Sequence, residues 1–126
     1  MEYPAKLTLI GYWAGTEADD SWPHPQDHVD ETWRTSDRDF VGLYLSKGLV
    51  ARSYMGYSPC RICGANNGNL ELTDGYFVWP EGLSHYVIDH AVRPPEDFVT
   101  HVSQMTDAIE GAPRDEDWWR SYGPSV

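Results

Sequence analysis

Basic residues are scarce in this sequence of 126 residues, which has nine Lys and Arg against 20 Asp and Glu and a formal net charge of −11. So acidic a chain is repelled by phosphate backbones and anionic lipids, which disfavours direct nucleic-acid backbone binding and membrane-surface binding. Long apolar runs are absent, and none approaches the roughly 18 to 20 residues that span a bilayer. The first residues lack a basic region followed by an apolar core, so we expect no secretory signal and a cytoplasmic location.

Common catalytic motifs are absent as well. The sequence contains no P-loop, no Gly-rich dinucleotide turn, no Gly-x-Ser-x-Gly and no His-Glu-x-x-His, which disfavours the common cofactor enzymes. The sequence has only two cysteines, Cys60 and Cys63. Because cytoplasmic thiols stay reduced, a Cys-x-x-Cys pair there favours metal binding or redox chemistry over a structural disulfide.

The residues that are present predict one folded domain over 1–126. A hydrophobic content of 40%, with six Trp, eight Tyr and three Phe, is too high for a disordered acidic tail. The negative charge lies at the two ends, with −6 on residues 1–40 and −5 on residues 96–126, whereas residues 41–95 are neutral. We therefore expect the site in the middle of the chain, and acidic ends that suit a basic protein partner.

The hydrophobic pattern predicts an α+β fold, in which helices accompany a small antiparallel sheet. Strands are expected at residues 6–13 and 49–57, and a β-hairpin at 69–79. Helices are expected at residues 37–47 with Ser36 as N-cap, at 80–90 opened by Pro80, and from residue 95 to the break at 111–113. Residues 113–126 read as a loose tail or a short helix.

The spacing of the two cysteines and of two histidines that follow them is typical of zinc sites. Gly64 follows Cys63 directly, and 21 residues separate Cys63 from His85, which forms a His-x4-His pair with His90. A knuckle, a hairpin and a helix in this order resemble a treble-clef zinc finger over residues 58–93. The expected ion is Zn²⁺, and four protein ligands would make the site closed and structural rather than catalytic.

Helix geometry complicates the second half of this ligand set. At about 100° per residue, His85 and His90 point roughly 140° apart on a straight helix. Both reach one ion only if the last helical turn loosens. We therefore keep His101 and Asp89 as alternates for His90, in that order.

Two other interpretations of the cysteines stay open. They are an unliganded buried pair or a redox dithiol. Redox chemistry is the weaker rival because it needs a helix N-terminus behind the first thiol, whereas a polar loop is predicted at residues 64–69.

Beyond the cysteines, the chain resembles a family of small uncharacterised bacterial proteins. The resemblance rests on Cys-Arg-x-Cys-Gly at 60–64, Asn-Gly at 67–68, Glu-Leu-Thr-Asp-Gly at 71–75, Trp-Pro-Glu-Gly-Leu-x-His-Tyr-Val at 79–87, and His90. It implies a soluble bacterial protein and no particular activity.

The same motifs gather polar and aromatic residues that form a candidate ligand pocket. Its candidates are Asn67, Glu71, Trp79, Glu81, Tyr86 and Arg93. The structural alternative assigns them to turns, a helix cap and an ion pair, and this alternative is favoured.

Two function classes follow from the sequence. In the first, the protein is a zinc-stabilised binding protein, such as a regulatory adaptor or an immunity-type inhibitor, that meets a basic partner. In the second, it is a small hydrolase-like zinc enzyme with three protein ligands, an open fourth position, and Glu81, Asp89 or His90 as acid or base.

Overall fold

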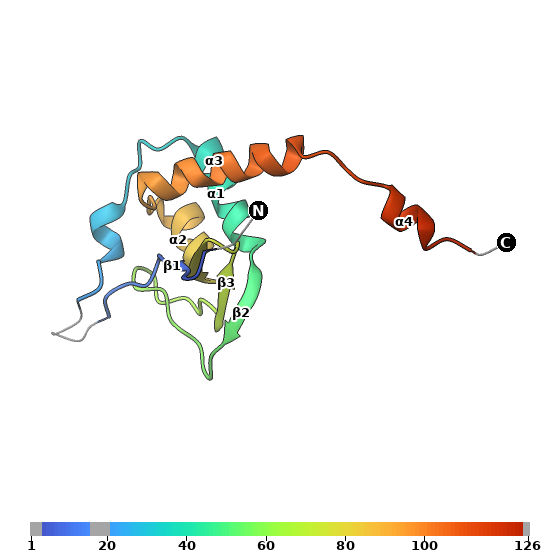
Figure 1. Ribbon diagram of the computed structural model, residues 1–126. Coiled ribbons are helices and arrows are strands. Elements are labelled where there is room, and N and C mark those ends of the chain that lie inside the picture. Colours follow the sequence, from blue (N-terminus) through green and yellow to red (C-terminus); the bar gives the residue numbers. More distant parts are fainter. Residues whose placement is uncertain (1–3, 16–20, 125–126) are drawn as a thin grey trace.

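The computed structural model describes residues 4–15 and 21–124 and shows an α+β fold (Figure 1). Its elements in chain order are β1 (Thr8–Leu9), a short 3-10 helix (Pro25–His28), α1 (Thr35–Ser46), β2 (Leu49–Ser53), β3 (Leu70–Thr73), β4 (Phe77–Pro80), α2 (Leu83–His90), α3 (Glu96–Gly111) and α4 (Asp117–Ser121). The predicted hairpin, the helix ending at His90 and the long helix after residue 95 are all present.

The sheet is mixed rather than purely antiparallel. Its strand order is β1-β4-β3-β2, and β3 pairs antiparallel with both β2 and β4. β1 pairs parallel to β4, with Thr8 opposite Phe77, so the expectation of an antiparallel sheet was wrong for this edge. Two parallel strands must be joined by a long crossover connection. Here the chain between β1 and β4, which includes α1, β2 and β3, forms that connection.

Both outer strands are shorter than the sequence pattern suggested. β1 covers only two residues, because the chain leaves the sheet at Gly11, whose φ of +76° lies in the left-handed region. β2 ends at Ser53, after a register irregularity between Val50 and Arg52.

Two helices begin at residues other than those predicted. α1 begins one residue before Ser36, and no side chain caps it. Pro80 is the last residue of β4 rather than the first of a helix. The sheet ladder continues beyond it, because the Glu81 amide donates to the Leu70 carbonyl at 2.8 Å, so α2 begins only at Leu83.

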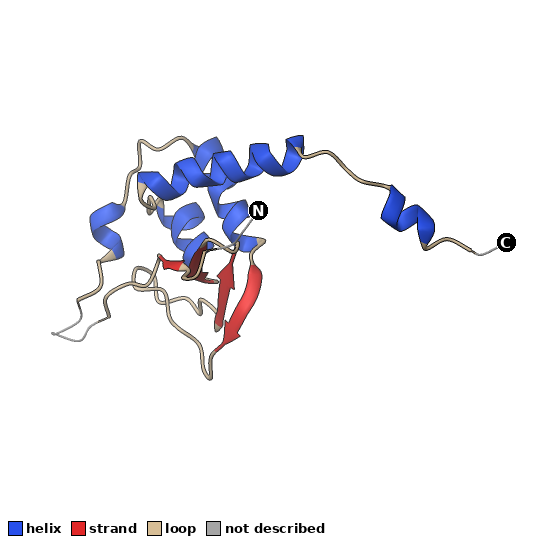
Figure 2. Cartoon of the chain, in the orientation of Figure 1, coloured by secondary structure: helices blue, strands red, loops and turns tan. Residues whose placement is uncertain are grey.

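Helices α1, α2 and α3 gather on one side of the sheet (Figure 2). The core between these layers is centred on Trp79 and Phe98, which are both fully buried. The Trp79 indole N–H donates to the Leu45 carbonyl at 3.1 Å and so satisfies its polar atom inside the core. α1 approaches α2 closely at Gly42, where a Cβ would lie 2.3 Å from Cγ1 of Ile88.

The C-terminal segment extends away from this body (Figure 1). α4 has no buried residue, and the side chains of Trp118, Trp119 and Tyr122 are exposed. Trp119 and Tyr122 stack on each other, with ring centroids 5.5 Å apart. None of the described helices combines the length and the apolar character that crossing a membrane requires.

Candidate metal centre

The two cysteines lie in a tight turn that the local sequence dictates. The Cys60 amide donates to the Ala65 carbonyl at 2.8 Å, and the Gly64 amide donates to the Cys60 carbonyl at 2.9 Å. Gly64 has a φ of +77°, a conformation that side chains disfavour. The turn closes with a bridge between Pro59 and Asn66, so both thiols project from one small loop, which we call the knuckle (residues 59–66).

The histidines come from α2, whose last turn is wider than an α-helical turn. The Ala91 amide donates to the carbonyl of Tyr86, five residues back instead of four, and Ala91 itself is left-handed with a φ of 54°. This C-cap residue follows His90 directly, so the helix ends at the second histidine. The rings of His85 and His90 nevertheless converge, with centroids 4.9 Å apart.

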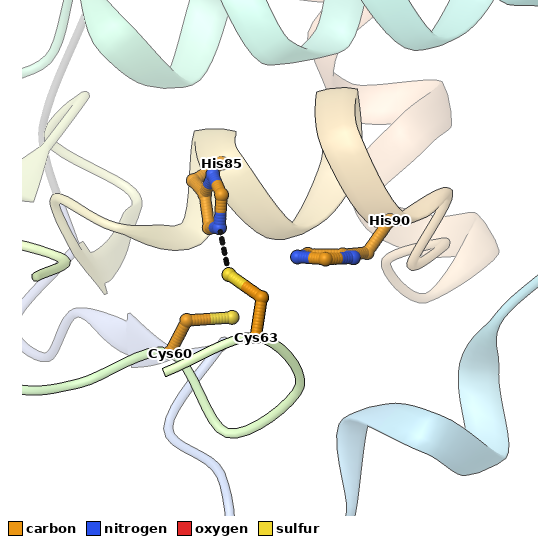
Figure 3. Close-up of side chains that lie close together, drawn as sticks. All are labelled: Cys60, Cys63, His85 and His90. Carbon is orange, nitrogen blue, oxygen red and sulfur yellow. Dashed lines mark hydrogen bonds between the residues drawn. The ribbon is translucent and has the colours of Figure 1, made fainter. Parts of the chain in front are cut away.

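The knuckle and α2 bring four ligand atoms together. One donor atom from each of Cys60, Cys63, His85 and His90 lies within 4.8 Å of the other three, which is close enough to bind a metal ion (Figure 3). Tetrahedral coordination at ordinary Zn–S and Zn–N lengths separates ligand atoms by about 3.3 to 3.8 Å. The Cys63 Sγ to His85 Nε2 distance of 3.4 Å falls in that range.

His90 supplies an independent sign that the cluster suits a cation. Its Nε2 atom is buried and has no hydrogen-bond partner among the described residues. The ring lies edge-on to that of His85, with centroids 4.9 Å apart, and Figure 3 shows it directed toward the sulfurs. A buried polar atom without a partner is destabilising, and a bound metal ion would satisfy this one.

Cys60 is prepared to act as a thiolate. Burial by itself raises its pKa, but hydrogen bonds from the backbone amides of Cys63 and Ile62 and from the side chains of Cys63 and His85 lower it, so the pKa of the thiol lies below its ordinary value. The Ile62 amide lies 3.4 Å from Sγ. Since the thiolate is the metal-binding form, these contacts favour coordination.

His85 is oriented by a carboxylate. Its Nδ1 lies 2.7 Å from Oδ2 of Asp89, one helical turn onward, and its Nε2 faces Cys63. A proton on Nδ1 leaves the Nε2 lone pair available to a metal, the arrangement found in carboxylate–histidine–zinc triads. Asp89 was expected as an alternate ligand, but the structure places it behind His85 and outside the group of four.

The other alternate, His101, lies elsewhere. It is on α3, and its Nε2 is 2.8 Å from Oδ2 of Asp74 in the β3–β4 turn. Its ring packs against Phe77, with centroids 4.8 Å apart. His101 thus fastens α3 to the hairpin and is outside the group of four.

The six pocket candidates do not form one pocket. Trp79 is in the core, Arg93 pairs with Asp30 and Glu96, and the Glu81 carboxylate accepts the Asn69 and Leu70 amides. The remaining three, Asn67, Glu71 and Tyr86, lie in or beneath a groove beside the knuckle.

Tyr86 has a role at the metal centre that its sequence position did not reveal. Its hydroxyl accepts the Arg61 amide at 2.7 Å, between the two cysteines, and it also hydrogen-bonds the Cys60 thiol. The sequence indicated only that Tyr86 follows His85 in the predicted helix. That position does not specify a hydrogen bond to the Arg61 amide, which lies 25 residues earlier in the chain.

Comparison with known proteins gives no match: no family model, no curated protein and no solved structure corresponds to this chain. The family resemblance in the motifs therefore stays a prediction, and functional inference rests on the geometry of the site.

Proposed function

We propose that the protein binds one Zn²⁺ through Cys60, Cys63, His85 and His90, in a structural centre of the treble-clef type. The observation that carries this proposal is the convergence of four donor atoms within 4.8 Å, together with the buried Nε2 of His90, which has no partner in the part of the chain that the structure describes. Two thiolates and two imidazoles are a donor set that suits Zn²⁺ and tetrahedral geometry.

Four protein ligands leave no open position for a substrate or a water molecule. Zinc enzymes keep one such position, so a closed site argues for a structural role and against the hydrolase-like alternative. The ion would join the knuckle to α2 and close residues 58–93 into one unit. Its binding would add on the order of 10 kcal/mol to folding, which is comparable to the whole stability of a small domain.

Metal analysis of protein purified without chelator tests the centre. We expect one zinc per chain, and cobalt substitution should give the intense visible absorption of tetrahedral Co²⁺ together with thiolate-to-cobalt charge transfer. His90→Ala should weaken both signals, whereas His24→Ala, which changes an exposed histidine outside the group, should not. Absence of zinc would overturn the proposal, and a weak spectrum of higher coordination would favour an open, enzyme-type site.

The cellular role that fits this architecture is that of an acidic binding or adaptor protein for a basic partner. In support, the net charge of −11 lies at the two ends of the chain, and the acids of the C-terminal segment, Asp115, Glu116 and Asp117, are exposed. Exposed charges of one sign steer a partner of opposite charge and are screened by salt. An immunity-type inhibitor is one form that such a protein would take.

Binding experiments at two ionic strengths test this role. Metal-loaded protein used as bait should retain a basic protein at low salt and release it at high salt. Replacing Asp115, Glu116 and Asp117 by their amides should weaken binding of that partner in purified form, while Ser103→Ala, a neutral change on the exposed surface of α3, should not. Recovery of no basic partner at low salt would contradict the adaptor role and leave the zinc proposal untouched.

A further inference from the structure

An open groove of about 400 Å³ lies beside the knuckle, and nothing in the proposed zinc centre accounts for it. It is bounded by residues 11–13, by the loop 54–59 and by residues 67–70, with Tyr86 at the end next to the metal centre. We call it the knuckle groove. Its volume is within the range of small-molecule sites.

One wall of the groove carries a buried carboxylate network. Glu71 is only 6% exposed, and its Oε2 accepts the hydroxyls of Tyr12 at 2.6 Å and of Tyr54 at 3.1 Å. Both tyrosines line the groove, whereas Glu71 lies behind them. Because each hydroxyl proton is committed to Glu71, the phenolic oxygens keep lone pairs that can accept a hydrogen bond from a ligand.

Among the described residues that line the groove, one side chain carries a full charge, the cation of Arg61, although the chain carries a net charge of −11. The carboxylate of Glu71, behind the wall, is itself contacted by Arg52, whose Nε lies 3.7 Å from Oε1. The guanidinium is exposed and donates to the carbonyl of Pro59, which also lines the groove. Arg61 also lies between the two cysteines, so the knuckle fixes the position of its backbone.

The rest of the lining is aromatic. Tyr12, Trp13, Tyr54, Tyr57 and Tyr86 all contribute surface to the groove. Trp13 and Tyr86 meet edge to face, with ring centroids 5.9 Å apart, which holds their orientation. Aromatic walls of this kind favour a flat ring through stacked or edge-on contacts.

We propose that the knuckle groove binds a small aromatic compound that carries one carboxylate or similar anionic group and a hydrogen-bond donor on its ring. Arg61 receives the anionic group, the aromatic walls enclose the ring, and the phenolic oxygens of Tyr12 and Tyr54 accept the donor. Charge and aromatic contact act together here, because a guanidinium–carboxylate contact gains strength beside a low-dielectric wall. The groove is separate from the four metal ligands, so the inference goes beyond the proposed zinc centre.

Amide chemical shifts report this binding directly. Titration of the metal-loaded, ¹⁵N-labelled protein with 4-hydroxybenzoate should shift the amides of Gly56, Arg61 and Asn67 to Asn69, with a Kd on the order of 1 mM for so small a probe. 4-Hydroxybenzamide, which lacks the charge, and benzoate, which lacks the ring donor, should each bind about tenfold more weakly.

Matched variants locate the contacts. Arg61→Gln should weaken 4-hydroxybenzoate about tenfold, whereas Arg120→Gln, the same change on exposed α4, should leave the Kd unchanged. Tyr54→Phe should weaken 4-hydroxybenzoate but not benzoate, a difference that simple loss of folding would not produce. Tyr122→Phe is its control, because it makes the same change at the exposed end of α4, outside the groove.

Two results would overturn the inference: groove amides that stay unshifted at about 10 mM probe, or equal affinity for the carboxylate and the amide. The zinc content of every sample is measured alongside. A zinc-free protein that still binds the probe would therefore contradict the metal proposal alone, and a zinc-loaded protein that ignores the probe would contradict the groove alone.

Discussion

The Sγ atom of Cys63 lies 3.4 Å from Nε2 of His85, although a β-hairpin and 21 residues separate them along the chain. The contact joins the knuckle to the first turn of α2, and on its other side the His85 ring is held by Asp89. It places a thiol and an imidazole at the separation that two ligands of one tetrahedral ion adopt.

Removing one thiol should abolish metal binding and lower the stability of the fold. Cys60→Ser should abolish stoichiometric zinc and lower the free energy of unfolding by several kcal/mol, because a buried ligand is lost and His90 Nε2 is left without a partner. Excess chelator should act in the same direction on the unchanged protein. Thermal unfolding followed by circular dichroism, with metal analysis of each sample, measures both effects.

Ser58→Ala, a hydroxyl removed just outside the knuckle, is the control for this change and should keep its zinc. A Cys60→Ser protein with unchanged zinc content and unchanged unfolding would contradict the assignment of Cys60 as a ligand.

Asp89→Asn should weaken the metal centre without removing a ligand. The carboxylate fixes the tautomer of His85 through a 2.7 Å contact, so its neutralisation should lower zinc affinity by about 10- to 100-fold. Competition with a chromophoric chelator gives the affinity. Asp107→Asn, on the exposed surface of α3, makes the same charge change away from the site and should leave the affinity unaltered.

The β3–β4 turn should contribute a pH-dependent part of the stability. Burial by itself raises the pKa of Asp74, but hydrogen bonds from the Tyr44 hydroxyl, the Phe77 and Tyr76 amides, and His101 lower it below its ordinary value. A depressed carboxyl pKa stabilises the fold above the unfolded-state pKa of about 4, and this contribution is lost as the pH falls through the lower folded-state value.

Asp74→Asn should therefore lower the free energy of unfolding by about 2 kcal/mol at neutral pH. The difference in unfolding free energy between the variant and the unchanged protein should shrink below about pH 4. Urea unfolding of both proteins across this range gives the two curves. Zinc loss in acid affects both alike, so their difference isolates Asp74. A constant difference at all pH values would show that the charge of Asp74 is not the cause.

The α1–α2 contact should tolerate no side chain at Gly42. Alanine is the better helix former, yet its Cβ would lie 2.3 Å from Cγ1 of Ile88, so Gly42→Ala should destabilise the protein by about 1 to 3 kcal/mol. Shortening the opposing residue in Gly42→Ala/Ile88→Ala should recover part of this loss, a coupling that a double-mutant cycle measures.

Gly111→Ala is the matched control, because no atom lies within 4 Å of the added Cβ. It should be neutral or slightly stabilising. Equal destabilisation by the two substitutions would assign the effect to the backbone rather than to the crowding at Ile88.

The elements that could be predicted from sequence are those set by local chemistry. Turn residues and alternating apolar residues specified the hairpin of β3 and β4, and helical spacing after Pro95 specified α3. The tight turn at Cys60 to Gly64 was predictable for the same reason, because a turn with a glycine behind it depends only on neighbouring residues. The N-terminal pattern failed for β1, whose length depends on β4, a strand almost 70 residues further on.

The sequence by itself predicted a group of two cysteines and two histidines, with His101 and Asp89 as alternates for His90, and it determined the acidic ends and the neutral middle, since composition and spacing are properties of the chain. Only the tertiary structure decided that the rings of His85 and His90 converge, with centroids 4.9 Å apart, and that Asp89 lies behind His85, outside the group of four. It also decided that Tyr12 reaches Glu71, 59 residues onward, to form the wall of the knuckle groove. The physical reason is that hydrogen bonds between distant segments form only when the packed core brings them together, and no local pattern encodes their partners.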